Sequence, residues 1–341
     1  KGLAAEDQKK IDQTLIELDG TANKSNLGAN AILSASLATC DAAAKSQETP
    51  LYQYILNLSR IPHNAFRIPS PMLLMLEGGL HAKSSRDFQE YMICPKGTSS
   101  FVSQLEEGTK IYHSLEGVLD QKAFSTAVGV EGGFWPQKLD TIQALTVLEE
   151  AIAKAEVEKN KVGICLDIAA NSFSHGETYK LSGLNQVKSS RELLTLYQDL
   201  KNQFSTLFSL EDPFSETDFE AWKSIRKELK ETKIVADDLT VTSPKKLKSL
   251  IGDQLFNAVI VKPNQVGTLS ETLEFARIAK ENDLELVVSH RAGETGSSFI
   301  ADLAVGIGAE YIKTGAPARG ERVAKYNRLL EIERELESSS K

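Results

Sequence analysis

The stretch KIVADDLTVTSPKKLKSLIGDQLFNAVIVK, residues 233–262, contains two short apolar runs that are each followed by a charged side chain. The first run leads to Asp237 and the second leads to Lys262. Their separation is that of one strand followed by one helix. Strands that alternate with helices predict a parallel sheet with right-handed crossovers, so this stretch favours an α/β fold.

The same rhythm extends in both directions from this stretch. Further apolar runs predict strands at 162–167, 206–211, 284–290 and 310–313. A helical period predicts helices at 141–155, 190–204, 219–229, 270–281 and 298–308. An open doubly wound sheet would carry a glycine-rich phosphate turn after its first strand, and Gly132-Gly133 lacks that fingerprint. We therefore expect a (β/α)8 TIM-like barrel, for which ~250 residues are typical.

The first sixty residues follow a different pattern. Apolar residues at helical spacing in 6–18, an alanine-rich stretch at 27–46 and a short run from Leu51 predict helices. We expect a mostly helical N-terminal domain at 1–60 and a barrel domain at 61–341.

The composition narrows the class of protein. With 39 basic and 47 acidic residues the net charge is −8, which disfavours nucleic-acid binding by bulk charge. Apolar runs stay below the ~18 residues of a membrane span. Cys40, Cys94 and Cys165 lie far apart, so we expect buried free thiols in a reducing compartment, the cytoplasm.

Acidic residues follow three of the predicted strands. Asp167, Glu211 and Asp237 would converge on one mouth of a barrel, where active sites lie. One acid after a strand is usually a helix cap or loop residue, but three facing one another would repel. A hard divalent cation resolves that repulsion, and all-oxygen ligation favours Mg²⁺, Mn²⁺ or Ca²⁺ over zinc.

Two further places carry candidate acid–base groups. Lys262 is either a general base with a pKa lowered by burial and by the nearby metal or a lysine in a buried ion pair, and its position leaves both open. Glu131, in GVEGGFWP (129–136), is either a general acid or an exposed acid in a simple turn. Glu90 offers a second carboxyl group, and a pair that shares a proton can keep one member neutral.

Ten ordered segments resemble the enolase family from about residue 6 to the C-terminus. They are KSNLGANAILS (24–34), GGLHA (78–82), FQEYM (88–92), VGVEGGF (128–134), LDIAA (166–170), LEDPF (210–214), VADDLTVTSP (235–244), KPNQVGTLSET (262–272), SHRAGET (289–295) and IKTGAPARGERVAKYN (312–327). Each segment alone is weak, but the ordered set is highly specific.

The resemblance implies an enolase-type barrel that reversibly dehydrates 2-phosphoglycerate to phosphoenolpyruvate with Mg²⁺. Lys262 would remove the proton beside the carboxylate, and Glu131, aided by Glu90, would protonate the leaving hydroxide. The implied metal ligands are Asp167, Glu211 and Asp237. The implied substrate contacts are His81, Gln89, Glu90, His290, Arg291, Ala292 and Lys313.

The resemblance also implies a homodimer, and an N-terminal sheet that precedes Lys1 in family members, so residues 1–60 would be the remainder of a capping domain. Val130, Pro263 and Ala292 depart from the family pattern of Asp, a Val-like residue and Ser. These departures motivate an alternative, an enolase-like protein with weak or no catalysis in a structural or binding role. An acid-sugar dehydratase would share the metal acids, but His81, Glu90 and the loop around Glu131 match enolases.

Overall fold

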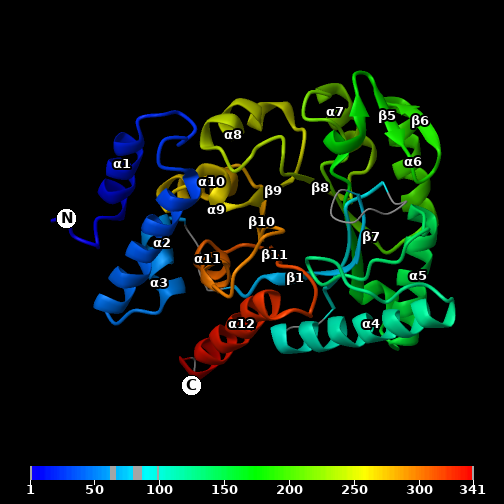
Figure 1. Cartoon of the computed structure of the whole chain (residues 1–341), viewed down its shortest axis with the longest axis horizontal. Helices are drawn as coiled ribbons and strands as arrows, with labels where there is room; N and C mark the ends of the chain where they lie inside the picture. The colour runs from blue at the N-terminus through cyan, green and yellow to red at the C-terminus, as the bar shows by residue number, and fades with distance from the viewer. Residues whose placement is uncertain (1, 62–66, 80–86, 98–99, 340–341) are drawn as a thin grey trace.

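Eight strands close into a barrel in the computed structural model, which describes residues 2–61, 67–79, 87–97 and 100–339 (Figure 1). Around the barrel the strands follow the order β1-β11-β10-β9-β8-β7-β3-β2. Their bounds are β1 (Ser70–Glu77), β2 (Glu90–Pro95), β3 (Val162–Asp167), β7 (Leu207–Glu211), β8 (Lys233–Ala236), β9 (Ala258–Val261), β10 (Glu285–Ser289) and β11 (Tyr311–Lys313). The expected TIM-like barrel is confirmed.

Strand β2 runs against its two neighbours, whereas the other neighbouring pairs are parallel. The sequence analysis expects a parallel sheet and does not identify β1 or β2. Because β2 is reversed, it begins at the mouth where the other strands end. Glu90 therefore pairs in register with Glu77 and with Asp167, and Asp167 pairs with Glu211.

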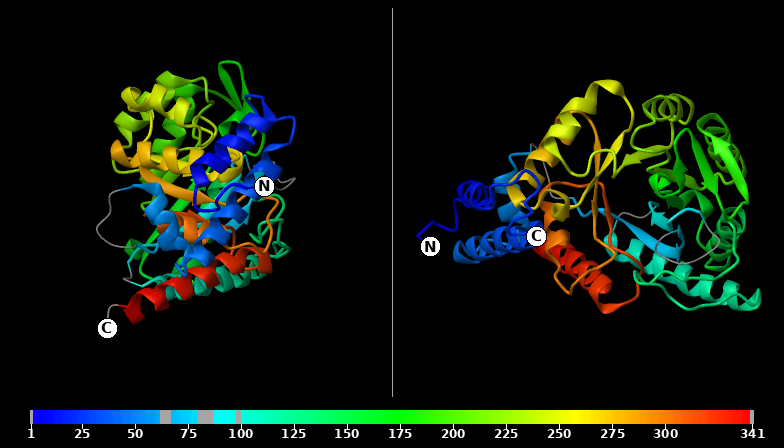
Figure 2. Two further views of the ribbon diagram at one scale, coloured as in Figure 1. Left: turned by 90° about the vertical axis from the view of Figure 1, so that its left-hand side faces the viewer. Right: turned by 45° about the horizontal axis from the view of Figure 1, so that its top comes forward.

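Helices surround the barrel (Figure 2). They are α4 (Phe101–Gln121), α5 (Thr141–Lys154), α6 (Ser190–Gln203), α7 (Phe219–Glu228), α8 (Pro244–Leu250), α9 (Pro263–Val266), α10 (Leu269–Glu281), α11 (Phe299–Gly306) and α12 (Gly320–Ser339). The predicted helices α5, α6, α7, α10 and α11 are confirmed. Helices α5 and α6 both begin with a capping box, in which the first side chain and the side chain three residues on bond each other's backbone N–H groups.

Shorter elements lie in the loops between strands and helices. A small sheet of β4 (Ser174–His175), β5 (Thr178–Leu181) and β6 (Gln186–Ser189) lies between β3 and α6 in the chain. The 3₁₀ turns are η2 (Lys159–Lys161), η3 (Ala170–Phe173) and η4 (Ile251–Asp253). In the part of the chain that the structure describes, each helix is too short or too polar to cross a membrane.

Helices α1 (Gln8–Asp19), α2 (Ala29–Ser46) and α3 (Leu51–Ser59) lie together on one side of the barrel, beside α10 and α11 (Figure 1). Two side chains of this group bond the first turn of α10. The Leu269 N–H donates to the Ser36 hydroxyl at 3.0 Å, and the Ser270 N–H donates to the Asp12 carboxylate at 2.9 Å. These bonds satisfy backbone donors that a helix start leaves without an intrahelical partner.

The core is continuous from the helical group into the barrel. All three cysteines are buried free thiols, as expected: Cys40 lies in α2, and Cys94 and Cys165 lie on the adjacent strands β2 and β3.

Candidate active site

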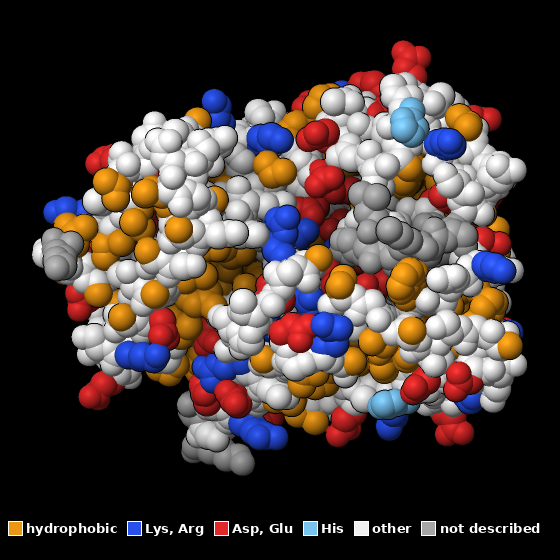
Figure 3. Space-filling model, viewed as in Figure 1, with side chains coloured by type: hydrophobic (Ala, Val, Ile, Leu, Met, Phe, Trp, Pro, Cys, Tyr) orange, Lys and Arg blue, Asp and Glu red, His pale blue; other side chains and the backbone are white. Residues whose placement is uncertain are grey.

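A cavity of about 410 Å³ opens at the mouth of the barrel. In Figure 3 acidic and basic side chains gather side by side near the middle of the face shown. The residues that line the cavity are Gln89, Glu90, Glu131, Asp167, Ala169, Asn171, Ser172, Asp212, Asp237, Asp238, Lys262, Gln265, Ser289, His290, Arg291, Ala292 and Lys313. This cavity contains the candidate site residues except Glu211 and His81. Glu211 bonds Lys313, which lines the cavity, and His81 lies outside the described residues.

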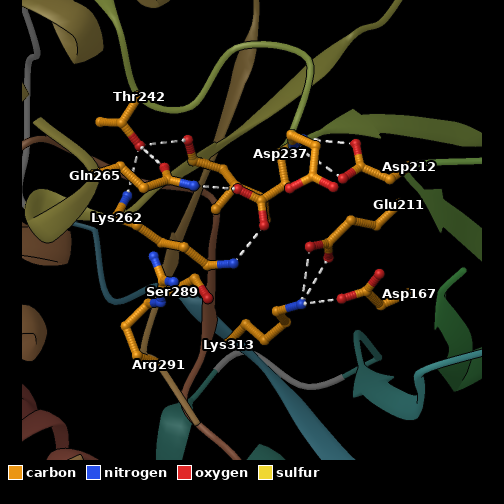
Figure 4. A network of polar contacts seen from close by, with 12 residues as sticks. Asp167, Glu211, Asp212, Asp237, Thr242, Lys262, Gln265, Ser289, Arg291 and Lys313 are labelled. Carbon is orange, nitrogen blue, oxygen red and sulfur yellow. Dashed lines mark hydrogen bonds and ion pairs between the residues drawn. The ribbon is translucent and has the colours of Figure 1, made fainter. Parts of the chain in front are cut away.

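Lys313, at the end of β11, lies among the carboxylates at the mouth of the barrel (Figure 4). Its ammonium group lies 2.9 Å from Glu211, 3.0 Å from Asp167 and 3.1 Å from Glu90. The side chain is 2% exposed. Burial alone would lower the pKa of Lys313, but Asp167, Glu211 and Glu90 together raise it well above its ordinary value. Lys313 is therefore a fixed positive charge that holds these carboxylates in place.

Lys262 forms a buried ion pair with Asp237, and Gln265 donates to the other oxygen of the same carboxylate at 2.8 Å (Figure 4). Burial works to lower the pKa of Lys262, but the Asp237 carboxylate outweighs it, and the net pKa is raised. Of the two alternatives for Lys262, the ion pair is the arrangement observed. The expected lowering of its pKa by burial is wrong for this arrangement, because burial also strengthens the attraction to Asp237.

The turn after β8 is held by Asp212. Its two carboxylate oxygens accept from the backbone N–H groups of Asp237 and Asp238, each at 2.9 Å. Burial and the nearby Asp237 raise the pKa of Asp212 well above its usual range. Asp212 thereby fixes the backbone from which Asp237 projects into the cavity.

Carboxylates at the mouth of the barrel form candidate cation sites. Among the described residues, two groups have potential ligand atoms within 4.8 Å of one another: Asp212, Asp237 and Asp238, and Glu90, Glu131 and His290. The expected set of Asp167, Glu211 and Asp237 is not one of these groups; Asp167 and Glu211 both contact Lys313, whereas Asp237 pairs with Lys262. Its donor atoms are nonetheless buried carboxylate oxygens on neighbouring strand ends, which suits a hard divalent cation.

Glu131 is 1% exposed, so the alternative of an exposed acid in a simple turn is wrong. Glu77, at the end of β1, accepts from the backbone N–H groups of Glu131 at 2.9 Å and Gly133 at 3.0 Å. A Cβ atom at Gly129 would lie 2.1 Å from the Glu77 carboxylate, so only glycine permits this approach. Burial and the Glu131 charge raise the pKa of Glu77 to about 7.

Glu90 and Glu131 approach one another, as expected of a carboxyl pair. Burial raises the pKa of Glu90 well above its ordinary value; Lys313 opposes this shift and Glu131 reinforces it. The Glu131 Oε2 atom lies 3.4 Å from Nε2 of His290, which is also buried. The pair therefore sits where one carboxyl group can retain a proton.

The remaining candidates lie around the rim. Gln89 donates to Asp167 at 3.3 Å. Arg291 is exposed and its guanidinium contacts Asn264 at 3.3 Å. Ala292 is exposed as well, and its carbonyl accepts from Arg322 at 2.6 Å.

The sequence analysis missed four residues of this region: Glu77, Asp212, Gln265 and Arg322. Glu77 follows an apolar run, which is the signal that identified Asp167, Glu211 and Asp237. Asp212 and Gln265 lie next to or close after residues already singled out. Arg322 stands in a charged helix and had no such signal.

The closed barrel and the cavity at its mouth are those of a (β/α)-barrel enzyme whose active site contains buried carboxylates and lysines. The family model described as the enolase C-terminal TIM barrel domain matches residues 65–341, and the one for the enolase N-terminal domain matches residues 1–55. The chain belongs to the enolase family, and enolases are lyases.

Individual relatives agree. The chain is 45% identical over 338 residues to the enolase of Helicobacter pylori strain HPAG1, which covers 98% of this chain and 78% of that protein. It is 45% identical over 341 residues to the enolase of Bifidobacterium animalis subsp. lactis, with 99% and 78% covered. For the enolase of Sulfurimonas denitrificans the identity is 43% over 337 residues, with 98% and 79% covered. These findings confirm the resemblance and do not favour a structural or binding role without catalysis.

Proposed function

We propose that the chain catalyses the reversible dehydration of 2-phosphoglycerate to phosphoenolpyruvate, with Lys262 as the base and Glu131, aided by Glu90, as the acid. The observation that carries the proposal is the cavity that contains these groups together with Lys313 and the strand-end carboxylates Asp167 and Asp237, with Glu211 bonded to Lys313 beside them. The likeness to proteins named enolase at about 45% identity supports it.

The reaction requires stabilisation of negative charge. The proton beside the substrate carboxylate is weakly acidic, and its removal leaves a dianion that only fixed positive charge can stabilise. Lys313 supplies such a charge, because its carboxylate neighbours hold it protonated. Mg²⁺, held by Asp167, Glu211 and Asp237, would supply Lewis-acid stabilisation of the same charge. Lys262 acts as the base only after its ion pair with Asp237 opens and its own proton leaves for solvent, which gives the neutral amine.

The second step needs an acid near neutral pH. The raised pKa of Glu90 favours its protonated form, and an oxygen of Glu131, the proposed acid, lies within 4.8 Å of an oxygen of Glu90. The proposed substrate contacts are His81, Gln89, Glu90, His290, Arg291, Ala292 and Lys313. Arg291 is exposed at the rim, and its planar guanidinium suits a phosphate group there.

The proposal also covers the domain division, the cellular location and the oligomeric state. Residues 1–60 form the helical part of a capping domain and 61–341 the barrel domain, which agrees with the two family-model matches. Buried free thiols suit the cytoplasm. The homodimer rests on family likeness, and analytical ultracentrifugation tests it.

The test is exchange of the C2 proton of 2-phosphoglycerate with solvent, followed by NMR in the presence of Mg²⁺. Wild type should exchange this proton and form phosphoenolpyruvate, and Lys262→Ala should lose at least ~10²-fold in exchange rate. Lys233→Ala is the matched control, because Lys233 also forms an ion pair at a strand end, with Glu285 at 2.7 Å, but at the opposite end of the barrel. Exchange that persists in Lys262→Ala at the control rate would remove Lys262 as the base.

A further inference from the structure

Arg322, in the first turns of α12, is 1% exposed and reaches two separate segments of the site. Its Nη1 atom lies 2.8 Å from Nδ1 of His290 and 2.8 Å from the Arg291 carbonyl oxygen. Its Nη2 atom donates to the carbonyl oxygens of Val130 at 3.1 Å and Ala292 at 2.6 Å. One guanidinium group therefore joins the loop that carries Glu131 to the loop that carries His290.

The contact with His290 determines which ring nitrogen carries the proton. A guanidinium group offers only donors, so Nδ1 of His290 must accept. In the neutral ring the proton is then on Nε2, which faces Oε2 of Glu131 at 3.4 Å. A doubly protonated ring would place an N–H against the N–H of Arg322, so this contact also disfavours the imidazolium form.

We propose that Arg322 is a positioning residue for the acid half of the reaction. It fixes His290 as the neutral tautomer that donates from Nε2 to Glu131, and it holds the backbone on either side of that contact. This inference rests on the proposed function in assigning Glu131 as the acid.

The surroundings of His290 agree with the neutral form. Burial is the main cause that lowers the pKa of His290; Glu131 opposes it, and Arg322 and Lys313 add to it. Backbone contacts complete the arrangement, since the His290 N–H donates to the Lys313 carbonyl and the Ala316 N–H donates to the Glu131 carbonyl. Backbone hydrogen bonds therefore fix both His290 and Glu131, and Arg322 additionally fixes the His290 ring.

The four acceptors require the planar, forked guanidinium group of arginine. Lysine keeps the positive charge, but a single ammonium group cannot bond two loops and a ring nitrogen in the same directions. Arg322→Lys therefore separates geometry from charge. Arg328→Lys is a matched control, because Arg328 lies on the same helix, is mostly buried and bonds Asp302 at 2.8 Å, away from His290.

The first measurement needs no substitution at Arg322. Nitrogen-15 NMR of the full chain labelled at histidine, with His290→Gln to assign the signal, reports the tautomer without turnover. We expect a neutral ring protonated at Nε2. A ring protonated at Nδ1, or a charged ring at neutral pH, would overturn the proposal even if the chain is an active enolase.

The second measurement compares the two steps of the reaction. In Arg322→Lys we expect exchange of the substrate C2 proton to fall less than about threefold, while net dehydration falls tenfold or more and the NMR signal shows mixed tautomers. Arg328→Lys should leave the ratio of the two rates and the tautomer unchanged. Equal losses of exchange and dehydration in Arg322→Lys, or an unchanged tautomer, would contradict the proposal. If the chain shows neither rate, the proposed function fails, while the tautomer measurement still tests the contact itself.

Discussion

Lys313 brings one ammonium group to three carboxylates that come from three different strands. Such a group costs desolvation energy, and only the surrounding acids offset it. Because Glu90, Asp167 and Glu211 all depend on the same ammonium, their positions are coupled. A cation that binds here would meet carboxylates whose negative charge Lys313 already partly neutralises.

Asp237→Asn tests the proposed cation ligands. We expect it to weaken Mg²⁺ binding at least tenfold, because it removes one anionic oxygen from a set of three that suits a hard cation. Isothermal titration calorimetry of the full chain measures this. Asp238→Asn is the comparison, since Asp238 lines the same cavity but is not among the proposed ligands. An equal loss in Asp238→Asn would assign the cation to Asp212, Asp237 and Asp238 instead.

Glu77→Gln tests the raised pKa behind the Glu131 loop. In the folded chain Glu77 keeps its proton up to about pH 7, whereas in the unfolded chain it loses the proton near the ordinary pKa of 4.5. Since the unfolded form then binds fewer protons, Glu77 makes the free energy of unfolding fall as pH rises from about 4.5 to 7. Below and above this window its contribution is constant.

Urea unfolding of both proteins across this range gives the difference directly. The free energy of unfolding of wild type, relative to Glu77→Gln, should decrease from pH 4.5 to 7 and then level off. Glutamine still offers Oε1 to the N–H groups of Glu131 and Gly133, so the loop should keep its geometry. Parallel pH profiles would show that Glu77 titrates at its ordinary pKa.

At the residue scale, the sequence predicts which groups reach the mouth but not their partners. Asp167, Glu211, Asp237, Lys262 and Lys313 follow from their position after a strand. That Lys313 contacts the first two acids and Lys262 the third depends on side-chain directions, which strand positions do not contain.

At the element scale, the turn from β8 to α8 stores strain. Val241 and Thr242 have φ of +43° and +53°, in the left-handed region that β-branched residues avoid. The Thr242 hydroxyl accepts from the Lys262 backbone N–H at 2.9 Å and donates to the Gln265 side chain at 2.5 Å (Figure 4). The strained turn therefore supports the start of the segment that carries Lys262 and Gln265.

Thr242→Val removes this hydroxyl and keeps the side-chain shape. We expect a loss of about 1–3 kcal/mol in the free energy of unfolding, because a buried N–H and a buried amide oxygen lose their partner. Exchange of the substrate C2 proton should fall as well, since Lys262 is less firmly held. Thr242→Ser keeps the hydroxyl and should retain both properties better. If the serine variant loses as much as the valine variant, the methyl group and not the hydroxyl holds the turn.

The sequence predicts well those strands that are followed by a segment with a clear helical period. For β3, β7, β8, β9, β10 and β11 the period changes from strand to helix within a few residues. The pair β1 and β2 breaks this rhythm, because antiparallel neighbours need no crossover helix. Helix α12 mixes charged and apolar residues with little preference for one face, so its period gave no prediction.

At the scale of the whole molecule, the helical group 8–59 is tied to the barrel through the start of α10. Gln8 donates to both Asp12 and Ser36, at 2.9 and 3.1 Å, and these two accept from the first N–H groups of α10. Sequence periodicity predicts the helices on either side of this contact. It does not predict the contact, because the bonded residues are more than two hundred positions apart.

Asp12→Ala combined with Ser36→Ala tests this connection. We expect faster amide exchange at Leu269 and Ser270 and a loss of about 0.5–2 kcal/mol for each lost cap. Hydrogen–deuterium exchange with mass spectrometry measures the first effect. Asp7→Ala is the control, because the Asp7 side chain caps α1 itself by accepting from the Lys10 N–H. Unchanged exchange at the start of α10 in the double variant would show that α10 does not depend on the helical group.

The pairing of β1 with β11 has a consequence for how the protein is made. Ser70 lies in register with Tyr311, so the two edges of the sheet can meet only after all the residues between these two strands have left the ribosome. At typical rates of synthesis the nascent chain spends roughly 10–50 s between these strands. Through that interval β1 presents open backbone donors and acceptors that other strands could occupy. Arg322 emerges later still, so the newborn chain completes its acid–base pocket only after both β1 and β11 have been made.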